Sequence, residues 1–123
     1  KCKFFIAGGS KDEDLIKLVM NSSIGTNSIS FSKMSIAETI PIIAACKIYI
    51  GNDTGWGHIS SGLNLKSLFL FCDSPPDAYA KYSNNISIIL PKGETVKSFR
   101  GHNARGKDKI SYDEVLKKSL ELI

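Results

Sequence analysis

Short apolar runs that alternate with helix-start signals constrain the fold of this chain more than any other feature. Five such runs are expected to form strands, over residues 3–7, 28–31, 48–50, 67–71 and 86–90. Glycine, proline or a polar turn ends nearly every run, and most of the runs are continuously apolar. Strands buried on both faces have this continuous pattern, as in parallel sheets that helices cover. The sequence therefore predicts the α/β class with a doubly wound parallel sheet.

Three serines, each followed three residues later by glutamate, predict where helices begin. These capping boxes start at Ser10, Ser35 and Ser111. In such a box the serine and glutamate side chains each satisfy a free amide of the first turn. Pro41 lies in the second of these helices and has no backbone N–H, which predicts a kink or a late start near Thr39.

Three further local expectations follow from turn residues and spacing. A short helix is expected over residues 59–63, ended by Gly62 or Asn64. The prolines of segment 74–77 predict a turn before the fifth strand. The last helix is expected to carry Val115, Leu116, Leu120 and Ile123 on one face.

Composition narrows the class of protein. With 42% apolar and 23% charged residues, a chain of 123 residues is expected to fold as one domain over residues 1–123. The longest apolar run, residues 68–72, is far shorter than the roughly 20 residues of a membrane span, and no signal peptide opens the sequence. The three cysteines lack the spacing of a disulfide framework or zinc site, which favours a soluble chain in a reducing cytoplasm.

The net charge of +4 is concentrated in one segment. Between Lys92 and Lys109 six basic residues face two acidic ones, and the rest of the chain is balanced. A single basic segment, unlike a basic face, favours a solvated loop or a local anion contact over a nucleic-acid-binding surface.

The segment after the third strand carries the strongest chemical signal, and it reads Gly51-Asn52-Asp53-Thr54-Gly55-Trp56-Gly57-His58. Ligands of parallel sheets bind beyond the carboxyl ends of strands, where glycine turns and helix starts present backbone amides. The hydroxyl of Thr54 and the three amides that follow can hold phosphate oxygens, with His58 in the next helical turn. An ordinary helix start, with Asp53 or Thr54 as the cap, explains the same residues.

The turn after the first strand, Gly8-Gly9-Ser10-Lys11-Asp12-Glu13, is a second candidate. It matches neither the GxGxxG nor the GxxxxGK[ST] pattern, which excludes the dinucleotide-binding and P-loop motifs. The carboxylates of Asp12 and Glu13 suit ribose hydroxyls. They equally suit the positive end of a helix.

The order of three segments resembles the carboxyl-terminal half of the ADP-heptose:lipopolysaccharide heptosyltransferase family, glycosyltransferase family 9. These segments are the turn over residues 8–13, the segment Lys33-Met34-Ser35-Ile36 and the string Asp-Thr-Gly-x-Gly-His over residues 53–58. The resemblance runs from about Phe4 to Pro91 and returns in the last helix. It implies a two-domain GT-B enzyme whose Rossmann-like carboxyl-terminal half holds a nucleotide-sugar, ADP-heptose or a similar one.

The resemblance also implies roles for single residues. Thr54, Gly55 and Gly57 would hold the diphosphate, Asp53 would accept from sugar hydroxyls and His58 would lie beside the donor. Trp56 would line the sugar pocket or, as we favour, pack under the loop. Asp12 or Glu13 would bind ribose, and Met34 would border the base. Family members invert configuration without a metal, so neither a metal site nor a cofactor is expected.

The family's catalytic carboxylate and a lysine-bearing phosphate loop lie before the part that this sequence resembles. We therefore expect no catalytic residue in this chain, and donor binding without turnover. The expected partners are a nucleotide-sugar and, through an amino-terminal domain, a lipid-linked glycan acceptor. We expect no nucleic-acid partner. We expect the chain to be a monomer. The expected place is the cytoplasm or the inner face of the inner membrane, where the basic segment could contact anionic lipid.

Two other classes remain open from the sequence. One is a non-catalytic nucleotide-binding or interaction module that keeps the sheet without the chemistry. The other is a flavodoxin-like domain with an unrelated ligand. The sequence shows neither an acidic cluster nor a flavin-loop pattern, so the flavodoxin-like alternative is the weaker one.

Overall fold

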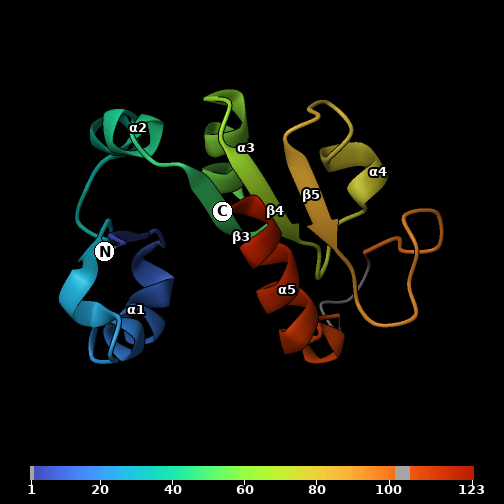
Figure 1. Cartoon of the computed structure of the whole chain (residues 1–123), viewed down its shortest axis with the longest axis horizontal. Coiled ribbons are helices and arrows are strands. Elements are labelled where there is room, and N and C mark those ends of the chain that lie inside the picture. Colours follow the sequence, from blue (N-terminus) through green and yellow to red (C-terminus); the bar gives the residue numbers. More distant parts are fainter. Residues whose placement is uncertain (1, 102–105) are drawn as a thin grey trace. The chain divides into compact units, whose positions relative to one another are not determined.

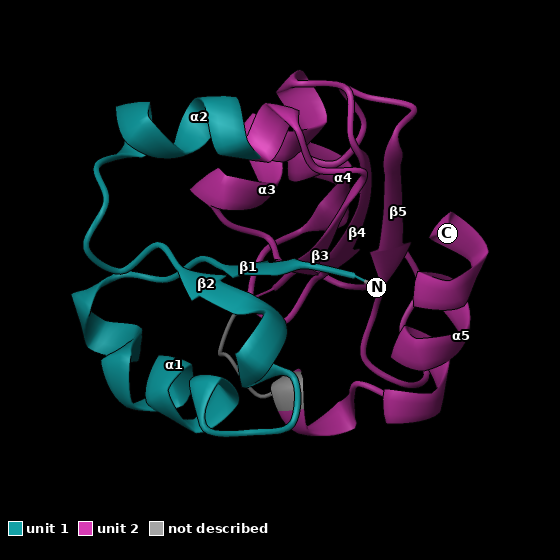
Figure 2. Ribbon diagram, turned by 60° about the vertical axis from the view of Figure 1, so that its left-hand side comes forward, with its two compact units in different colours: residues 1–42 teal, residues 43–123 magenta. Residues whose placement is uncertain are grey.

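A computed structural model of the chain describes residues 2–101 and 106–123 (Figure 1). The chain divides into two compact units, Lys1–Ile42 and Ile43–Ile123, which are described separately below (Figure 2). The single domain over residues 1–123 stays a prediction. No helix in the described part of the chain is both long enough and apolar enough to cross a membrane.

Unit 1 is built on a parallel pair of strands joined through a helix. Strand β1 (Phe4–Ile6) pairs with β2 (Ser28–Ser30), with Phe5 opposite Ile29. The Phe5 ring stacks on that of Phe31, with 5.5 Å between the ring centres. Both predicted strands are confirmed. Between them lie the 3-10 turn η1 (Ser10–Asp12), the helix α1 (Glu13–Met20) and the 3-10 turn η2 (Gly25–Asn27).

The first predicted capping box is wrong by one residue. The cap is Gly9, whose backbone N–H donates to Oδ2 of Asp12 at 2.9 Å. Because η1 is a tight 3-10 turn, the short aspartate side chain reaches back to the amide three residues before it. The carboxylate of Asp12 is therefore engaged in closing the turn.

The second capping box is confirmed. Helix α2 (Ile36–Ala44) begins directly after Ser35, whose backbone N–H and hydroxyl both donate to Glu38 Oε2 at 2.7 Å. The amide of Glu38 donates back to the Ser35 hydroxyl at 3.3 Å. The late start near Thr39 is wrong, because these bonds close the first turn and Pro41 is accommodated inside the helix.

The capping box of α2 gives a testable pH dependence. Hydrogen bonds from the hydroxyl and then the backbone of Ser35 hold the pKa of Glu38 below its ordinary value of 4.5. This interaction therefore stabilises the folded chain above about pH 4.5, and the contribution is lost as the pH falls through the lower folded value. Ser35→Ala is expected to raise the pKa of Glu38 toward its ordinary value in a carbon-detected NMR titration. An unchanged pKa in this variant would contradict the box.

Unit 2 contains a three-stranded parallel sheet in the order β3-β4-β5. Its strands are β3 (Ile48–Asn52), β4 (Lys66–Leu70) and β5 (Ile86–Ile89). The side chains of Leu68 and Phe69 on the central strand are fully buried, as are Phe71 and Ile89. Helix α3 (Gly55–Gly62) and helix α5 (Tyr112–Leu122) lie on opposite faces of this sheet (Figures 1 and 2). The predicted α/β class with a doubly wound sheet is confirmed.

Helix α3 begins earlier than predicted. It starts at Gly55, directly after an extended Thr54, whereas the sequence predicts a helix only from residue 59. Glycine has a low helix propensity, which favoured a turn over residues 55–57, but packing against the sheet overrides that preference here. The predicted end is confirmed, since Asn64 adopts the left-handed conformation with φ of 68°.

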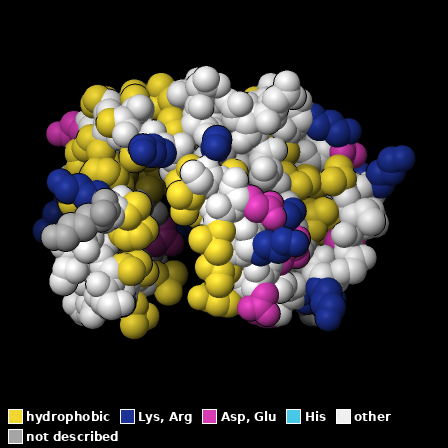
Figure 3. Space-filling model, in the orientation of Figure 1, with side chains coloured by type: hydrophobic (Ala, Val, Ile, Leu, Met, Phe, Trp, Pro, Cys, Tyr) yellow, Lys and Arg dark blue, Asp and Glu magenta, His cyan; other side chains and the backbone are white. Residues whose placement is uncertain are grey.

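The last helix, α5, begins after Ser111 as predicted, and the Ser111 hydroxyl accepts from the Glu114 amide at 3.4 Å. Most of its predicted apolar face is uncovered. Leu116, Leu120 and Ile123 are exposed, and hydrophobic side chains lie at the surface beside α5 (Figure 3). The half-buried positions of the helix include Val115 and Lys118, whose amine donates to the Ile88 carbonyl at 2.8 Å.

The two ends of the basic segment over residues 92–109 are hydrogen-bonded to each other. The Lys92 amide donates to the Lys109 carbonyl at 3.0 Å, and the turn η3 (Lys107–Lys109) ends the loop. Its described side chains Lys92, Lys97, Arg100 and Lys109 are exposed, as in a solvated loop. Arg105, which the sequence counts among the basic residues, lies outside the described residues. The turn predicted at residues 74–77 is followed by one helical turn, α4 (Pro76–Tyr79).

Candidate functional site

The carboxyl ends of β3 and β4 are tied together by the residues that follow them. The Asp53 amide donates to the Leu70 carbonyl at 3.3 Å, which continues the pairing of the two strands. The Ser74 hydroxyl, four residues beyond the end of β4, donates to Oδ2 of Asp53. The candidate segment over residues 53–58 therefore lies where parallel sheets hold their ligands.

Asp53 carries the most buried charge of this segment. Its side chain is 7% exposed, and its second oxygen, Oδ1, lies 3.0 Å from Nε2 of His58. Oδ1 has no well-aligned hydrogen bond within the described residues. A buried carboxylate is costly unless paired, so the neighbours Ser74 and His58 account for its stability there. Both oxygens face protein groups.

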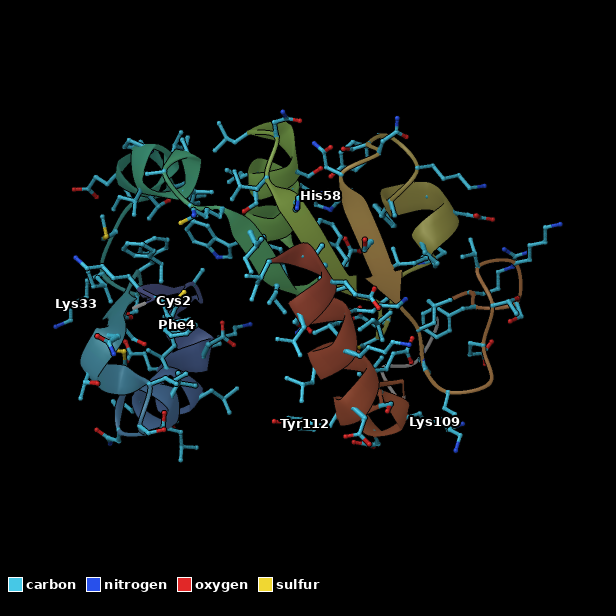
Figure 4. All side chains as sticks on the ribbon, in the orientation of Figure 1. Cys2, Phe4, Lys33, His58, Lys109 and Tyr112 are labelled. Atoms are coloured by element: carbon cyan, nitrogen blue, oxygen red, sulfur yellow. The ribbon has the colours of Figure 1, made fainter. Side chains whose placement is uncertain are left out.

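His58 connects this carboxylate to a tyrosine from another loop. The side chain is 35% exposed, and Nδ1 lies 2.6 Å from the hydroxyl of Tyr82. The ring stands edge-on to Phe69 of the central strand, with 5.5 Å between the ring centres. Figure 4 labels His58 on α3. We call the four residues Ser74, Asp53, His58 and Tyr82 the Asp53 network.

The turn between Asp53 and His58 presents backbone donors. Thr54 is extended, and its hydroxyl makes no capping bond to α3. The His58 amide closes the first turn on the Thr54 carbonyl at 3.2 Å. No hydrogen bond to the amides of Gly55 and Gly57 forms within the described residues. Free first-turn amides and the positive end of a helix together attract an anion.

A half-buried tyrosine contacts this turn. The Tyr49 hydroxyl donates to the Asn52 carbonyl at 3.0 Å and lies 3.4 Å from the hydroxyl oxygen of Thr54. Burial raises the pKa of Tyr49 above its ordinary value of 10; the hydrogen bond to Thr54 opposes this rise and the charge of Asp53 adds to it. The phenol is therefore a neutral donor at physiological pH.

The two predicted phosphate glycines have different surroundings. A Cβ on Gly55 would meet no atom within 4 Å, so this position is open. A Cβ on Gly57 would lie 2.7 Å from Cζ and 2.8 Å from Cε1 of Phe69. Packing against Phe69 thus accounts for the missing side chain of Gly57, whereas a side chain at Gly55 would enter open space. The role of each amide at a phosphate stays a prediction.

The remaining predicted site residues are Trp56 in unit 2 and three residues of unit 1. Trp56 is half-buried in the first turn of α3. Asp12 is engaged with Gly9, whereas the carboxylate of Glu13 is exposed and has no hydrogen bond within the described residues. Met34 lies in the turn after β2, and its amide donates to the Phe31 carbonyl at 2.9 Å.

Sequence reasoning missed Ser74, Tyr82 and Tyr49. Ser74 follows β4 as Asp53 follows β3, so the rule that ligand sites gather at the carboxyl ends of parallel strands could have found it. No pattern in the sequence marks Tyr82, which lies 24 residues beyond His58. Among the described residues, no three His, Cys, Asp or Glu side chains gather as metal ligands would.

Comparisons with known proteins give a family match and a structural likeness. The family model described as glycosyltransferase family 9 (heptosyltransferase) matches residues 2–107. No curated protein matches the chain. The solved structure of E. coli ADP-heptose lps heptosyltransferase II is similar, with a TM-score of 0.77 and 20% sequence identity over 98% of this chain.

That likeness confirms the predicted Rossmann-like fold of the GT-B type. This chain spans 36% of the length of the E. coli protein, about a third. The family match, in contrast, rests on sequence and extends over most of the chain. The chain therefore belongs to glycosyltransferase family 9, the heptosyltransferase family.

Proposed function

We propose that this chain is the donor-binding part of a glycosyltransferase and holds a nucleotide-sugar of the ADP-heptose type. The complete enzyme would transfer the sugar with inversion and without a metal, in the synthesis of lipopolysaccharide or another cell-envelope glycan. Family membership supports this proposal. The observation that carries it is the open first turn of α3, where two glycine amides that have no partner among the described residues lie next to the buried Asp53 in the chain.

The first turn of α3 offers what a diphosphate requires. The Thr54 hydroxyl is not used as a helix cap, and the amides of Gly55 and Gly57 have no partner within the described residues. We assign these groups to the phosphate oxygens. As the glycosidic bond of the donor breaks, negative charge grows on the leaving diphosphate, and fixed amides with a helix dipole stabilise such charge without reorganising.

The other residues have supporting roles in this proposal. The contact of Asp53 with sugar hydroxyls stays a proposal, because its oxygens face Ser74 and His58. In unit 1 we assign ribose binding to Glu13 rather than Asp12, because the Asp12 carboxylate closes its own turn. Met34 bordering the base and Trp56 beside the sugar or under the loop also remain proposals.

Two glycines at opposite ends of α3 test the anion site. Gly55→Ala is expected to weaken binding of ADP-heptose and ADP-glucose by about tenfold, equal to about 1.4 kcal/mol, because its methyl group enters the space before the free amides. Gly62→Ala is the matched control, since its Cβ also meets no atom within 4 Å. It is expected to leave the affinity unchanged. Isothermal titration calorimetry on the 123-residue chain measures both.

The outcomes separate the donor-binding proposal from its alternatives. Equal affinities for the two variants would contradict the site at α3. A folded wild-type chain that binds no nucleotide-sugar would contradict the proposed function itself. Transfer to a lipid-linked acceptor on adding an amino-terminal acceptor domain would exclude a non-catalytic binding module.

A further inference from the structure

The side chains of the Asp53 network join the two ends of the proposed donor-binding turn. Asp53 and His58 flank the four residues from Thr54 to Gly57, and their side chains meet across this turn at 3.0 Å. Ser74 holds the Asp53 end of this side-chain bridge, and Tyr82 holds the His58 end. The bridge therefore joins loops that follow β3 and β4 to the segment before β5.

The partners of His58 determine which of its ring nitrogens carries a proton. A carboxylate can only accept, so the tautomer with its proton on Nε2 suits the 3.0 Å approach of this nitrogen to Asp53 Oδ1, although the two groups are not well aligned. In that neutral tautomer Nδ1 is an acceptor, and the Tyr82 hydroxyl at 2.6 Å donates to it. Each ring nitrogen of His58 has one partner. A flip of the ring would exchange the two nitrogens and turn the unprotonated one toward the carboxylate of Asp53.

The backbone around Tyr82 is fixed independently of His58. Asn85, three residues later, donates from Nδ2 to Oδ1 of Asn64 at 2.5 Å, and its carbonyl accepts from the Ser67 amide at 2.9 Å. On the other side, Lys81 pairs with Asp77 of α4 at 2.8 Å. Tyr82 itself is 56% exposed, so burial does not explain its position. Its ring lies beside that of His58, with 5.6 Å between the centres.

We propose that Tyr82 is a positioning residue of the donor site. Its hydroxyl holds the His58 ring with Nε2 toward Asp53, and the resulting bridge keeps the turn from Thr54 to Gly57 ready for the donor. This assignment rests on the proposed function, because the turn matters for affinity only if it holds the nucleotide-sugar. Tyr82 acts through His58 and is not assigned a contact with the reacting atoms.

Tyr82→Phe tests the assignment because it removes the hydroxyl and keeps the ring. The control is Tyr79→Phe, since Tyr79 is similarly exposed and its hydroxyl has no hydrogen bond within the described residues. Both variants carry His102→Asn, which leaves His58 as the single histidine of the sequence. Long-range proton–nitrogen NMR spectra at about pH 8.5, where imidazoles are ordinarily neutral, then report the two nitrogens of His58 directly.

The wild-type ring is expected to show the Nε2–H form, with Nδ1 shifted as a hydrogen-bond acceptor. Tyr82→Phe is expected to move the Nδ1 resonance and to weaken ADP-glucose binding about three- to tenfold, the size of one lost hydrogen bond. Tyr79→Phe is expected to change neither. The unfolding temperature of Tyr82→Phe is compared with that of the wild-type chain. If Tyr82 had only a structural role, a variant with an unchanged unfolding temperature would leave the nitrogen resonance of His58 unchanged.

Each other outcome overturns a defined part of the proposal. An unchanged Nδ1 resonance in Tyr82→Phe would show that the hydroxyl does not hold His58. A moved resonance with unchanged ADP-glucose affinity would overturn the positioning role but leave the proposed function standing. A wild-type chain that binds no ADP-glucose, ADP-heptose or ADP would overturn the proposed function and this role with it.

Discussion

Gly57→Ala is expected to lower the free energy of unfolding of unit 2 by about 1–3 kcal/mol, the usual cost of overpacking. The new methyl group would lie 2.7 Å from Cζ of Phe69 and 3.0 Å from Cε1 of Tyr49. Phe69 is fully buried in the central strand, so its ring cannot move aside freely. The loss is expected even though alanine favours a helix by about 1 kcal/mol over glycine.

Urea unfolding followed by the fluorescence of Trp56, the one tryptophan of the sequence, measures this loss. Gly55→Ala and Gly62→Ala are the matched controls, because each places its methyl group in open space on the same helix. Both are expected to keep or raise the stability. A double-mutant cycle with Phe69→Leu identifies the cause, since the smaller side chain should reduce the cost of Gly57→Ala. A Gly57→Ala chain as stable as the controls would contradict the tight packing of Gly57 against Phe69.

Gly101→Ala is expected to release the basic loop from the end of β4. Gly101 has a φ of 73°, where an L side chain is strained by about 1–2 kcal/mol. Its Cβ would also lie 2.6 Å from the Asp73 carbonyl oxygen and from the Ser74 backbone. A backbone clash cannot be relieved by turning a side chain, so we expect about 1–3 kcal/mol in addition.

Trypsin measures this release, because the loop contains the cleavage sites Lys92, Lys97 and Arg100. Gly93→Ala is the control: Gly93 has a φ of 90° but no atom within 4 Å of its Cβ, so this variant carries the strain without the clash. Cleavage is expected to be faster in Gly101→Ala than in Gly93→Ala. Equal rates would show that the contact with residues 73 and 74 does not hold the loop.

The same variant connects the loop to the candidate site. Gly101 lies against Ser74, whose hydroxyl donates to the buried carboxylate of Asp53. Displacing Ser74 would leave this oxygen without its donor, and a buried charge that loses a partner is costly. The NMR signals of the His58 ring are therefore expected to change in Gly101→Ala and to remain unchanged in Gly93→Ala.

Local signals predicted much of the fold. The apolar runs predict all five strands to within two residues at either end, and the box at Ser35 predicts the start of α2. Asn64 was correctly among the residues expected to end α3. These features depend on neighbours within about four residues, which is the range that periodicity and capping describe. The string over residues 53–58 likewise marked the candidate site before any geometry was known.

Features that depend on distant neighbours were missed or wrong. The α5 prediction placed Leu116 and Leu120 on one apolar face but could not tell that both are exposed, because the sheet contacts another face of the helix, with Lys118 bonded to the Ile88 carbonyl. The predicted start of α3 was four residues late, because glycine propensity is local whereas the packing of Gly57 on Phe69 is not.

The sequence by itself determined the alternation of parallel strands and helices and the family, and it predicts the turn at residues 53–58 as the place for a ligand. Only the tertiary structure decided which side chains the residues of this turn contact. Ser74 lies 21 residues after Asp53, and Tyr82 lies 24 residues after His58. Asp53 and Ser74 meet because the carboxyl ends of neighbouring parallel strands share one edge, whereas Tyr82 reaches His58 from the segment before β5, and no local pattern states which of these side chains will touch.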